Sequence, residues 1–121
     1  MNQELVEKLT KEIADYVTLM DHVTFAELNK FEGFEGDYFI STIQADEKNI
    51  FLWSRLSEEA AEALSVLLKK DTFHYEPCNP LIYFLDGACS SAPVAKRVRA
   101  YKKPHWLPVV LVKGPDPLEE K

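Results

Sequence analysis

The sequence of 121 residues contains no long hydrophobic run. The longest candidate, Leu107 to Val112, is interrupted by Pro108, whereas a membrane-spanning helix needs roughly 18 apolar residues or more. The first residues, Met1 to Glu4, are polar and acidic, whereas a secretory signal begins with basic and then apolar residues. We therefore expect a cytoplasmic protein that has no contact with a membrane.

Cysteine and glycine are both scarce. The chain has two thiols, Cys78 and Cys89, and its apolar content of 46% suffices for one core without a disulfide framework. The spacing of the thiols is not the C-x-x-C of a redox pair. The four glycines do not form a G-x-x-x-x-G-K phosphate motif. We therefore expect reduced thiols and no cofactor.

Acidic residues are absent from residues 87–115, which carry a net charge of +6, whereas residues 1–86 carry −10. The basic segment could contact an anionic partner, or it could lie against the acidic body of its own fold or of a second copy. The total charge of −6 opposes the approach of nucleic acid at long range. This favours the second explanation.

Two amphipathic helices are predicted by apolar residues at helical spacing. The first covers Leu5 to Met20. The second begins after Ser57, a residue suited to an N-cap, and its apolar stripe comprises Ala60, Ala61, Leu64, Leu67 and Leu68.

A short helix is predicted between these two. Thr24 and Glu27 have capping-box spacing, and Val23 and Leu28 occupy the positions of a hydrophobic staple. We expect this helix to end near Phe31, with Gly33 available for the left-handed conformation that closes a helix.

Strand-forming residues make up most of the remainder. Residues 38–43 and 49–53 predict two strands joined by a loop, although a helix over residues 38–45 also fits the pattern. Residues 72–76 and 81–85 predict a β-hairpin around the turn at residues 77–80, and residues 106–112 predict a final strand. In this hairpin His74 should face outward, because it alternates with Phe73 and Tyr75.

These elements predict a single α+β domain over residues 1–113 and a mobile tail over residues 114–121. The order helix, short β segment, helix and hairpin resembles a winged helix, a fold used on DNA and also for protein contacts. Residues 23–28, 81–87 and 101–109 resemble segments of small proteins from prophages and pathogenicity islands of Gram-positive bacteria. The resemblance implies a mobile genetic element as the setting, and it supplies no catalytic or binding residues.

Residues with catalytic or metal-binding chemistry are present but not in a specific arrangement. A zinc site would draw on His22, His74, His105, Cys78 and Cys89, of which His74 and Cys78 alone are closely spaced. A nucleophilic site would use Cys89 with a histidine as base and Asp86 to orient it. Neither pattern is specific, so we expect no metal site and no catalytic site.

The strongest candidate for a binding site is the basic stretch near the C-terminus. Basic side chains interleaved with aromatic rings can contact phosphates and stack on bases. Alternatively, the two rings pack in the core or at a sheet edge and the lysines form a solvated face. The candidate residues for an anionic partner are Lys96, Arg97, Arg99, Tyr101, Lys102, Lys103 and Trp106.

The sequence therefore favours a non-enzymatic interaction or regulatory protein of a phage or mobile genetic element that acts by binding a protein. The alternative is a winged-helix transcriptional regulator that binds DNA with a helix-turn-helix from residue 24 onward and with residues 96–103 on the phosphates. A third helix within residues 36–45 would favour the regulator, whereas two strands there would remove its recognition helix. Both functions are compatible with a homodimer.

Overall fold

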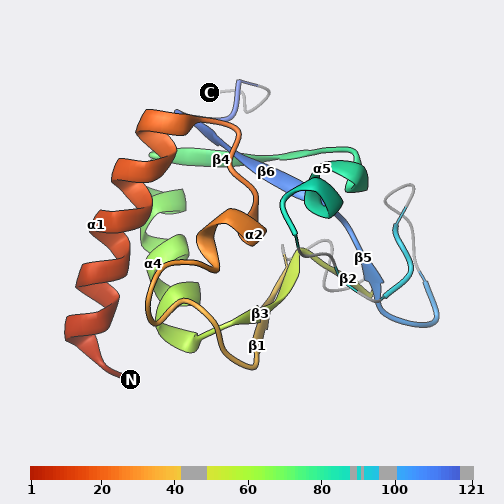
Figure 1. Ribbon diagram of the computed structural model, residues 1–121, viewed down its shortest axis with the longest axis horizontal. Coiled ribbons are helices and arrows are strands. Elements are labelled where there is room, and N and C mark those ends of the chain that lie inside the picture. Colours follow the sequence, from red (N-terminus) through yellow and green to blue (C-terminus); the bar gives the residue numbers. More distant parts are fainter. Residues whose placement is uncertain (42–48, 88–89, 91, 96–100, 118–121) are drawn as a thin grey trace.

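The chain is a mixed α+β protein, as the sequence predicts, in a computed structural model that describes residues 1–41, 49–87, 90, 92–95 and 101–117 (Figure 1). The helices found in these residues are α1 (Gln3–Met20), α2 (Phe25–Leu28), α4 (Glu58–Lys69) and α5 (Pro80–Leu85). The strands are β1 (Tyr38–Ile40), β2 (Ile50–Phe51), β3 (Trp53–Leu56), β4 (Phe73–Pro77), β5 (His105–Trp106) and β6 (Val109–Lys113).

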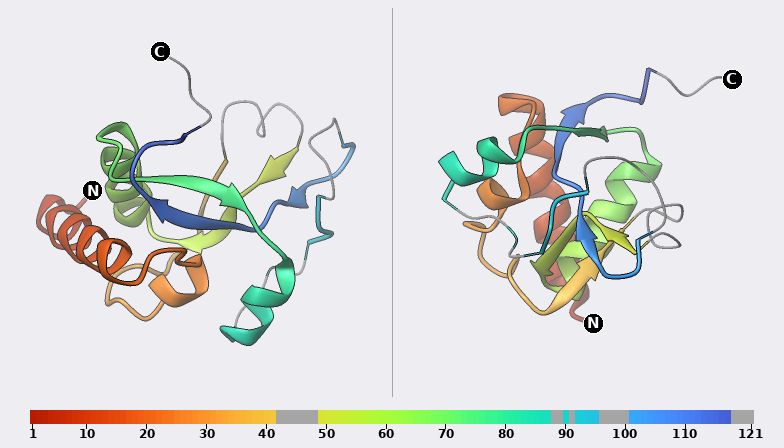
Figure 2. Two further views of the ribbon diagram at one scale, coloured as in Figure 1. Left: turned by 90° about the horizontal axis from the view of Figure 1, so that it is seen from above. Right: turned by 90° about the vertical axis from the view of Figure 1, so that its right-hand side faces the viewer.

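Helices α1 and α4 pack side by side at one end of the molecule, and α5 lies at the other end (Figures 1 and 2). The buried faces of α1 and α4 follow the predicted periodicity closely. In α4, however, Ala63 is buried, whereas Leu68 is partly exposed. The Ser57 side chain caps α4 by accepting a hydrogen bond from the Ala60 amide at 3.0 Å, as predicted.

The capping box that starts α2 is confirmed. Thr24 Oγ1 accepts from the Glu27 amide at 3.2 Å, and Glu27 Oε1 accepts from the Thr24 amide at 3.0 Å. The helix ends at Leu28, three residues before the predicted end, and Gly33 has the expected positive φ of 89°.

Three two-stranded sheets are formed by the described strands. β1 pairs antiparallel with β3, β2 pairs parallel with β5, and β4 pairs antiparallel with β6 from Phe73↔Lys113 to Pro77↔Val109. An isolated bridge joins Val23 to Leu111, so β6 is also bonded to the segment between α1 and α2.

The predicted hairpin of residues 72–76 and 81–85 is wrong. Its first strand exists as β4, but its second half is helix α5, and the partner of β4 is β6. The predicted final strand is also divided into β5 and β6 by Leu107 and Pro108, because proline has no N–H to continue a ladder.

Residues 38–40 form a strand and residue 41 is in neither a helix nor a strand, whereas residues 42–45, which complete the segment where a third helix is possible, lie outside the described residues. None of the helices in the described ranges combines the length and the apolar character needed to cross a membrane.

The core is centred on aromatic side chains from four different elements. Phe25, Trp53, Tyr83 and Trp106 are each 1% exposed or less, and the Trp53 ring packs against the other three at centroid distances of 5.3 to 6.1 Å. Burial of such large rings contributes much of the stabilisation of a domain of this size.

Candidate interaction surface

Helix α5 has well-formed ends despite its six residues. The Asn79 side chain caps it by accepting from the Leu81 amide at 2.9 Å, and Pro80 occupies the first helical position, where its missing N–H leaves no bond unmade. Gly87 closes the helix with a φ of 94°, in the left-handed region that favours glycine.

Tyr83 anchors α5 to the core. Its hydroxyl donates to the Val109 carbonyl at 2.6 Å and accepts from the Phe25 amide at 3.1 Å, so α5 is bonded to both β6 and α2. Its ring packs on Trp106 at 5.0 Å. Burial raises the pKa of this phenol well above its usual range, so the hydroxyl stays protonated and can donate.

A third hydrogen bond holds the C-terminal end of α5. Thr24 is fully buried, and its hydroxyl donates to a carboxylate oxygen of Asp86, the C-cap residue of α5, at 2.7 Å. The same Thr24 side chain starts α2, so one residue joins the beginning of α2 to the end of α5. Helix α5 is therefore held rigidly at its middle and at its C-terminal end.

The other large side chains of this anchored helix face solvent. We call Leu81, Ile82, Phe84 and Leu85 the α5 apolar face; they are 56%, 40%, 70% and 79% exposed, respectively. Residues 81, 84 and 85 are separated by three and four positions, which places them on one side of the helix. Monomeric proteins rarely leave a contiguous group of large apolar side chains uncovered unless it has a function.

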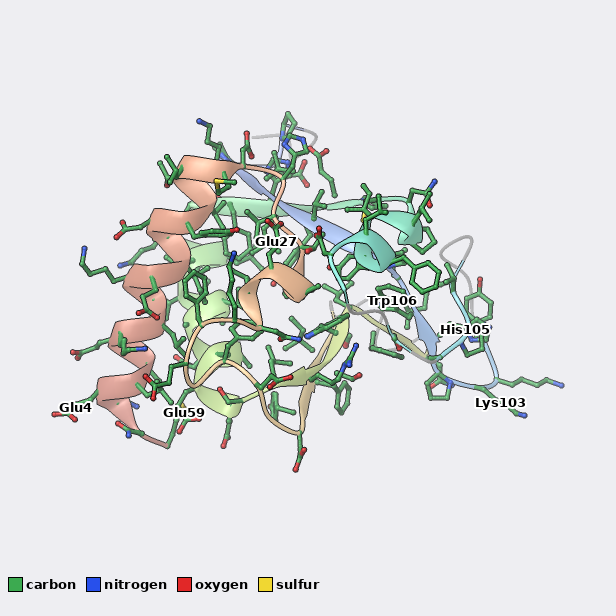
Figure 3. The ribbon with its side chains drawn as sticks, in the orientation of Figure 1. Glu4, Glu27, Glu59, Lys103, His105 and Trp106 are labelled. Atoms are coloured by element: carbon green, nitrogen blue, oxygen red, sulfur yellow. The ribbon has the colours of Figure 1, made fainter. Side chains whose placement is uncertain are left out.

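Residues of the predicted anion-binding stretch have different surroundings. Lys96, Arg97 and Arg99 lie outside the described residues. Lys102 and Lys103 are exposed, and Lys103 extends away from the domain (Figure 3). Tyr101 is partly buried and its ring stacks on the His105 ring at a centroid distance of 3.8 Å.

Trp106 is not available to stack on a base. It is 1% exposed, it points into the domain (Figure 3), and its Nε1 donates to the Leu52 carbonyl at 3.0 Å. The structure therefore places this ring in the core, which is the alternative that the sequence left open.

His74 is buried, contrary to the prediction that it faces outward. Its Nε2 lies 2.7 Å from a carboxylate oxygen of Glu76, and its Nδ1 lies 3.0 Å from the Gly114 carbonyl. Both acceptors are satisfied only when both ring nitrogens carry a proton. The alternation of side chains along the strand predicts an outward-facing His74, but these two acceptors make burial of its ring favourable.

The other candidates for reactive chemistry are not assembled into a site in the described part of the chain. Cys78 is a free, half-buried thiol, and burial together with the Asp86 carboxylate raises its pKa to about 11, which opposes thiolate formation. Cys89 lies outside the described residues. Within the described ranges, three or more His, Cys, Asp or Glu side chains do not come together as metal ligands.

The α5 apolar face is the feature that the sequence analysis missed. The composition of residues 81–85, five consecutive apolar side chains, predicts a buried strand. The signal that could have identified a helix is the Asn79-Pro80 pair, an N-cap residue followed by proline at the first helical position.

No protein-family model matches this chain, and neither a curated protein nor a solved structure matches it. The function is therefore inferred from the contacts and exposure of its own residues.

Proposed function

We propose that this chain is a non-enzymatic interaction protein that binds another protein through the α5 apolar face. The observation that carries the proposal is the combination of four exposed large apolar side chains with an anchor, Tyr83, that fixes the helix bearing them. Exposed apolar surface of this kind marks interaction sites, because covering it removes apolar area from water.

The anchoring favours tight binding. A helix already held by two bonds of Tyr83 and one of Asp86 loses little conformational freedom when a partner covers it. Large apolar side chains at positions 81, 84 and 85 have the spacing by which a helix fills a hydrophobic groove. We therefore propose a partner that presents an apolar groove.

At the α5 apolar face, charge supports a protein partner over an anionic one. Residues 1–86 carry −10, and the exposed Asp86 lies at the end of the apolar face. An acidic surface repels a nucleic-acid backbone or an anionic bilayer. As the setting of this interaction we propose the cytoplasm and a phage or mobile genetic element, on the resemblance of residues 23–28, 81–87 and 101–109.

Affinity capture from a bacterial lysate with matched variants tests the proposal. Leu85→Ser removes an apolar side chain of the face that is 79% exposed, and Leu19→Ser removes an equally exposed leucine, 80%, from α1 at the other end of the molecule. We expect a protein captured by the wild type to be lost with Leu85→Ser and kept with Leu19→Ser. Equal capture by both variants would refute the proposal.

Self-association is tested with the same proteins in sedimentation velocity. If a second copy is the partner, the wild type and Leu19→Ser are dimers, and Leu85→Ser and Phe84→Ser are monomers. In that outcome the α5 apolar face is still the binding surface, and the partner is identified as the chain itself.

The second candidate function is a winged-helix transcriptional regulator that binds DNA. It is favoured by Lys102 and Lys103, which are exposed and form no ion pair among the described residues. Three observations count against DNA binding and so favour protein binding. Helix α2 has only four residues, residues 38–40 form a strand where a recognition helix would begin, and Trp106 is buried and cannot stack on a base.

A further inference from the structure

A cavity of about 320 Å³ opens where the β1–β3 sheet meets the β2–β5 sheet. This volume is at the lower end of the range for small-ligand sites. Its apolar walls come from β1, from β2 and from the turn before β5, and are formed by Phe39, Ile50, Phe51 and Pro104. Phe39 is 56% exposed, so part of its side chain is accessible to a ligand.

Among the described residues, the polar ones that line the cavity are Asp37, Asn49 and Ser54. A carboxylate accepts hydrogen bonds, and a hydroxyl can both donate and accept them. The Asn49 amide donates through Nδ2 to the Tyr101 carbonyl at 3.0 Å, which leaves its Oδ1 as an acceptor. A carboxylate and an amide oxygen beside apolar walls suit a flat heterocycle that carries an amino group.

Residues 101–105, the basic turn beside the cavity, are held by hydrogen bonds and by ring stacking. The His105 amide donates to the Asn49 carbonyl at 2.8 Å, and His105 Nδ1 lies 2.8 Å from the Lys103 carbonyl. With the stacking of Tyr101 on His105, these contacts place Pro104 in the cavity wall and leave Lys102 and Lys103 exposed immediately before it. The flexible four-carbon stem of a lysine allows the ammonium group of either residue to turn toward a ligand in the cavity.

We infer that this cavity binds a nucleotide unit, with the base stacked on Phe39, its amino group bonded to Asp37 and its phosphate on Lys102 and Lys103. An aromatic side chain stacks on any base, a carboxylate accepts from an exocyclic amino group, and an ammonium group neutralises a phosphate. Asp37 repels the phosphate that the lysines attract, so the two charges orient the ligand. The ligand is either a free nucleotide or one unit of a single strand.

Isothermal titration calorimetry at low salt tests the inference with AMP, CMP, GMP and UMP. We expect the three nucleotides whose bases carry an amino group to bind more tightly than UMP. The nucleosides adenosine and cytidine should bind more weakly than AMP and CMP. Changing Lys102 and Lys103 together to Gln should reduce the affinity for AMP to that for adenosine.

Phe39→Ala should weaken binding by about ten-fold or more, the effect expected when a stacking partner is removed. Phe39 is exposed, so this variant should keep the melting temperature of the wild type. Leu19→Ala is the control, because it removes a large apolar side chain that is 80% exposed on α1 and is not part of the cavity lining, and it should leave nucleotide binding unchanged.

A single-stranded decanucleotide distinguishes the two sources of the ligand. Tighter binding of the strand than of the mononucleotides assigns the site to nucleic acid, and equal binding assigns it to the free nucleotide. Absence of binding by all four mononucleotides and the strand would overturn the inference, as would equal affinity in Phe39→Ala. The capture experiment on Leu85→Ser is independent of either result.

Discussion

His74 links the fold to pH at a single residue. Burial of the ring lowers its pKa, but the Gly114 carbonyl and the Glu76 carboxylate, with a smaller contribution from Asp116, outweigh burial and raise it above the ordinary value of 6.5. A raised pKa in the folded protein means that protonation stabilises the fold. This contribution is complete below pH 6.5 and is lost as pH rises through the folded pKa.

Glu76→Gln should reduce this pH dependence. Without the carboxylate the pKa of His74 falls, so the variant should be less stable than the wild type below pH 6.5 and should approach it at alkaline pH. Urea unfolding between pH 5 and pH 9 measures the effect. Glu62→Gln, on the exposed side of α4, is the control and should follow the wild type at every pH.

Tyr83→Phe tests the anchor of α5. The change leaves the buried Phe25 amide and Val109 carbonyl without the partner they share, and should lower the free energy of unfolding by about 1–3 kcal/mol. Urea denaturation of Tyr83→Phe and of Tyr38→Phe, whose ring is 48% exposed, gives the comparison. Similar losses in both variants would contradict an anchoring role for the Tyr83 hydroxyl.

At the scale of elements, α4 offers a test of its packing. Leu64 is buried and Leu68 is partly exposed on the same helix. Leu64→Ala should lower the free energy of unfolding by about 2–5 kcal/mol, as large truncations in a core do. Leu68→Ala should lose much less, and chemical denaturation of the two variants ranks them. The reverse order would show that α4 is rotated from the orientation described.

The elements that could be predicted from the sequence carry their own signals. The α1 period, the Thr24–Glu27 capping box and the Ser57 cap depend on residues a few positions apart, and the structure confirms each of them. The strand at residues 38–40 also follows its composition.

The error in pairing arose because the partner of β4 lies far along the chain. By composition the apolar run 81–85 suits a strand next to β4, whereas the true partner, β6, begins 32 residues after β4, at Val109. Exposure of the α5 apolar face could not be predicted, because apolar side chains are ordinarily expected in the core. Of the basic stretch, the sequence identified exposed lysines at 102 and 103 but could not decide whether Trp106 was buried.

For the whole molecule, salt dependence of binding to duplex DNA separates the two candidate functions. If Lys102 and Lys103 contact phosphates, each should contribute about −0.9 to the slope of log affinity against log salt. Changing both lysines to Glu should then reduce the magnitude of the slope by about 2 in gel-shift titrations. We expect no duplex binding by the wild type at physiological salt, because residues 1–86 are acidic. Tight binding there, abolished by the double change, would support the regulator instead.

The position of β6 has a consequence for how the protein is made. This strand bonds both to Val23 and to β4, and Val109 supplies the carbonyl that holds Tyr83, so the segment before α2, strand β4 and helix α5 all depend on β6. Synthesis proceeds from the N-terminus, and pairing between distant segments is slow to form. While the ribosome is still adding residues 86–113, helices α1 and α4 can associate, but the aromatic core lacks one of its walls. A nascent chain stopped before Val109 should therefore be a substrate for chaperones and proteases, and addition of β6 should be the step that completes the aromatic core.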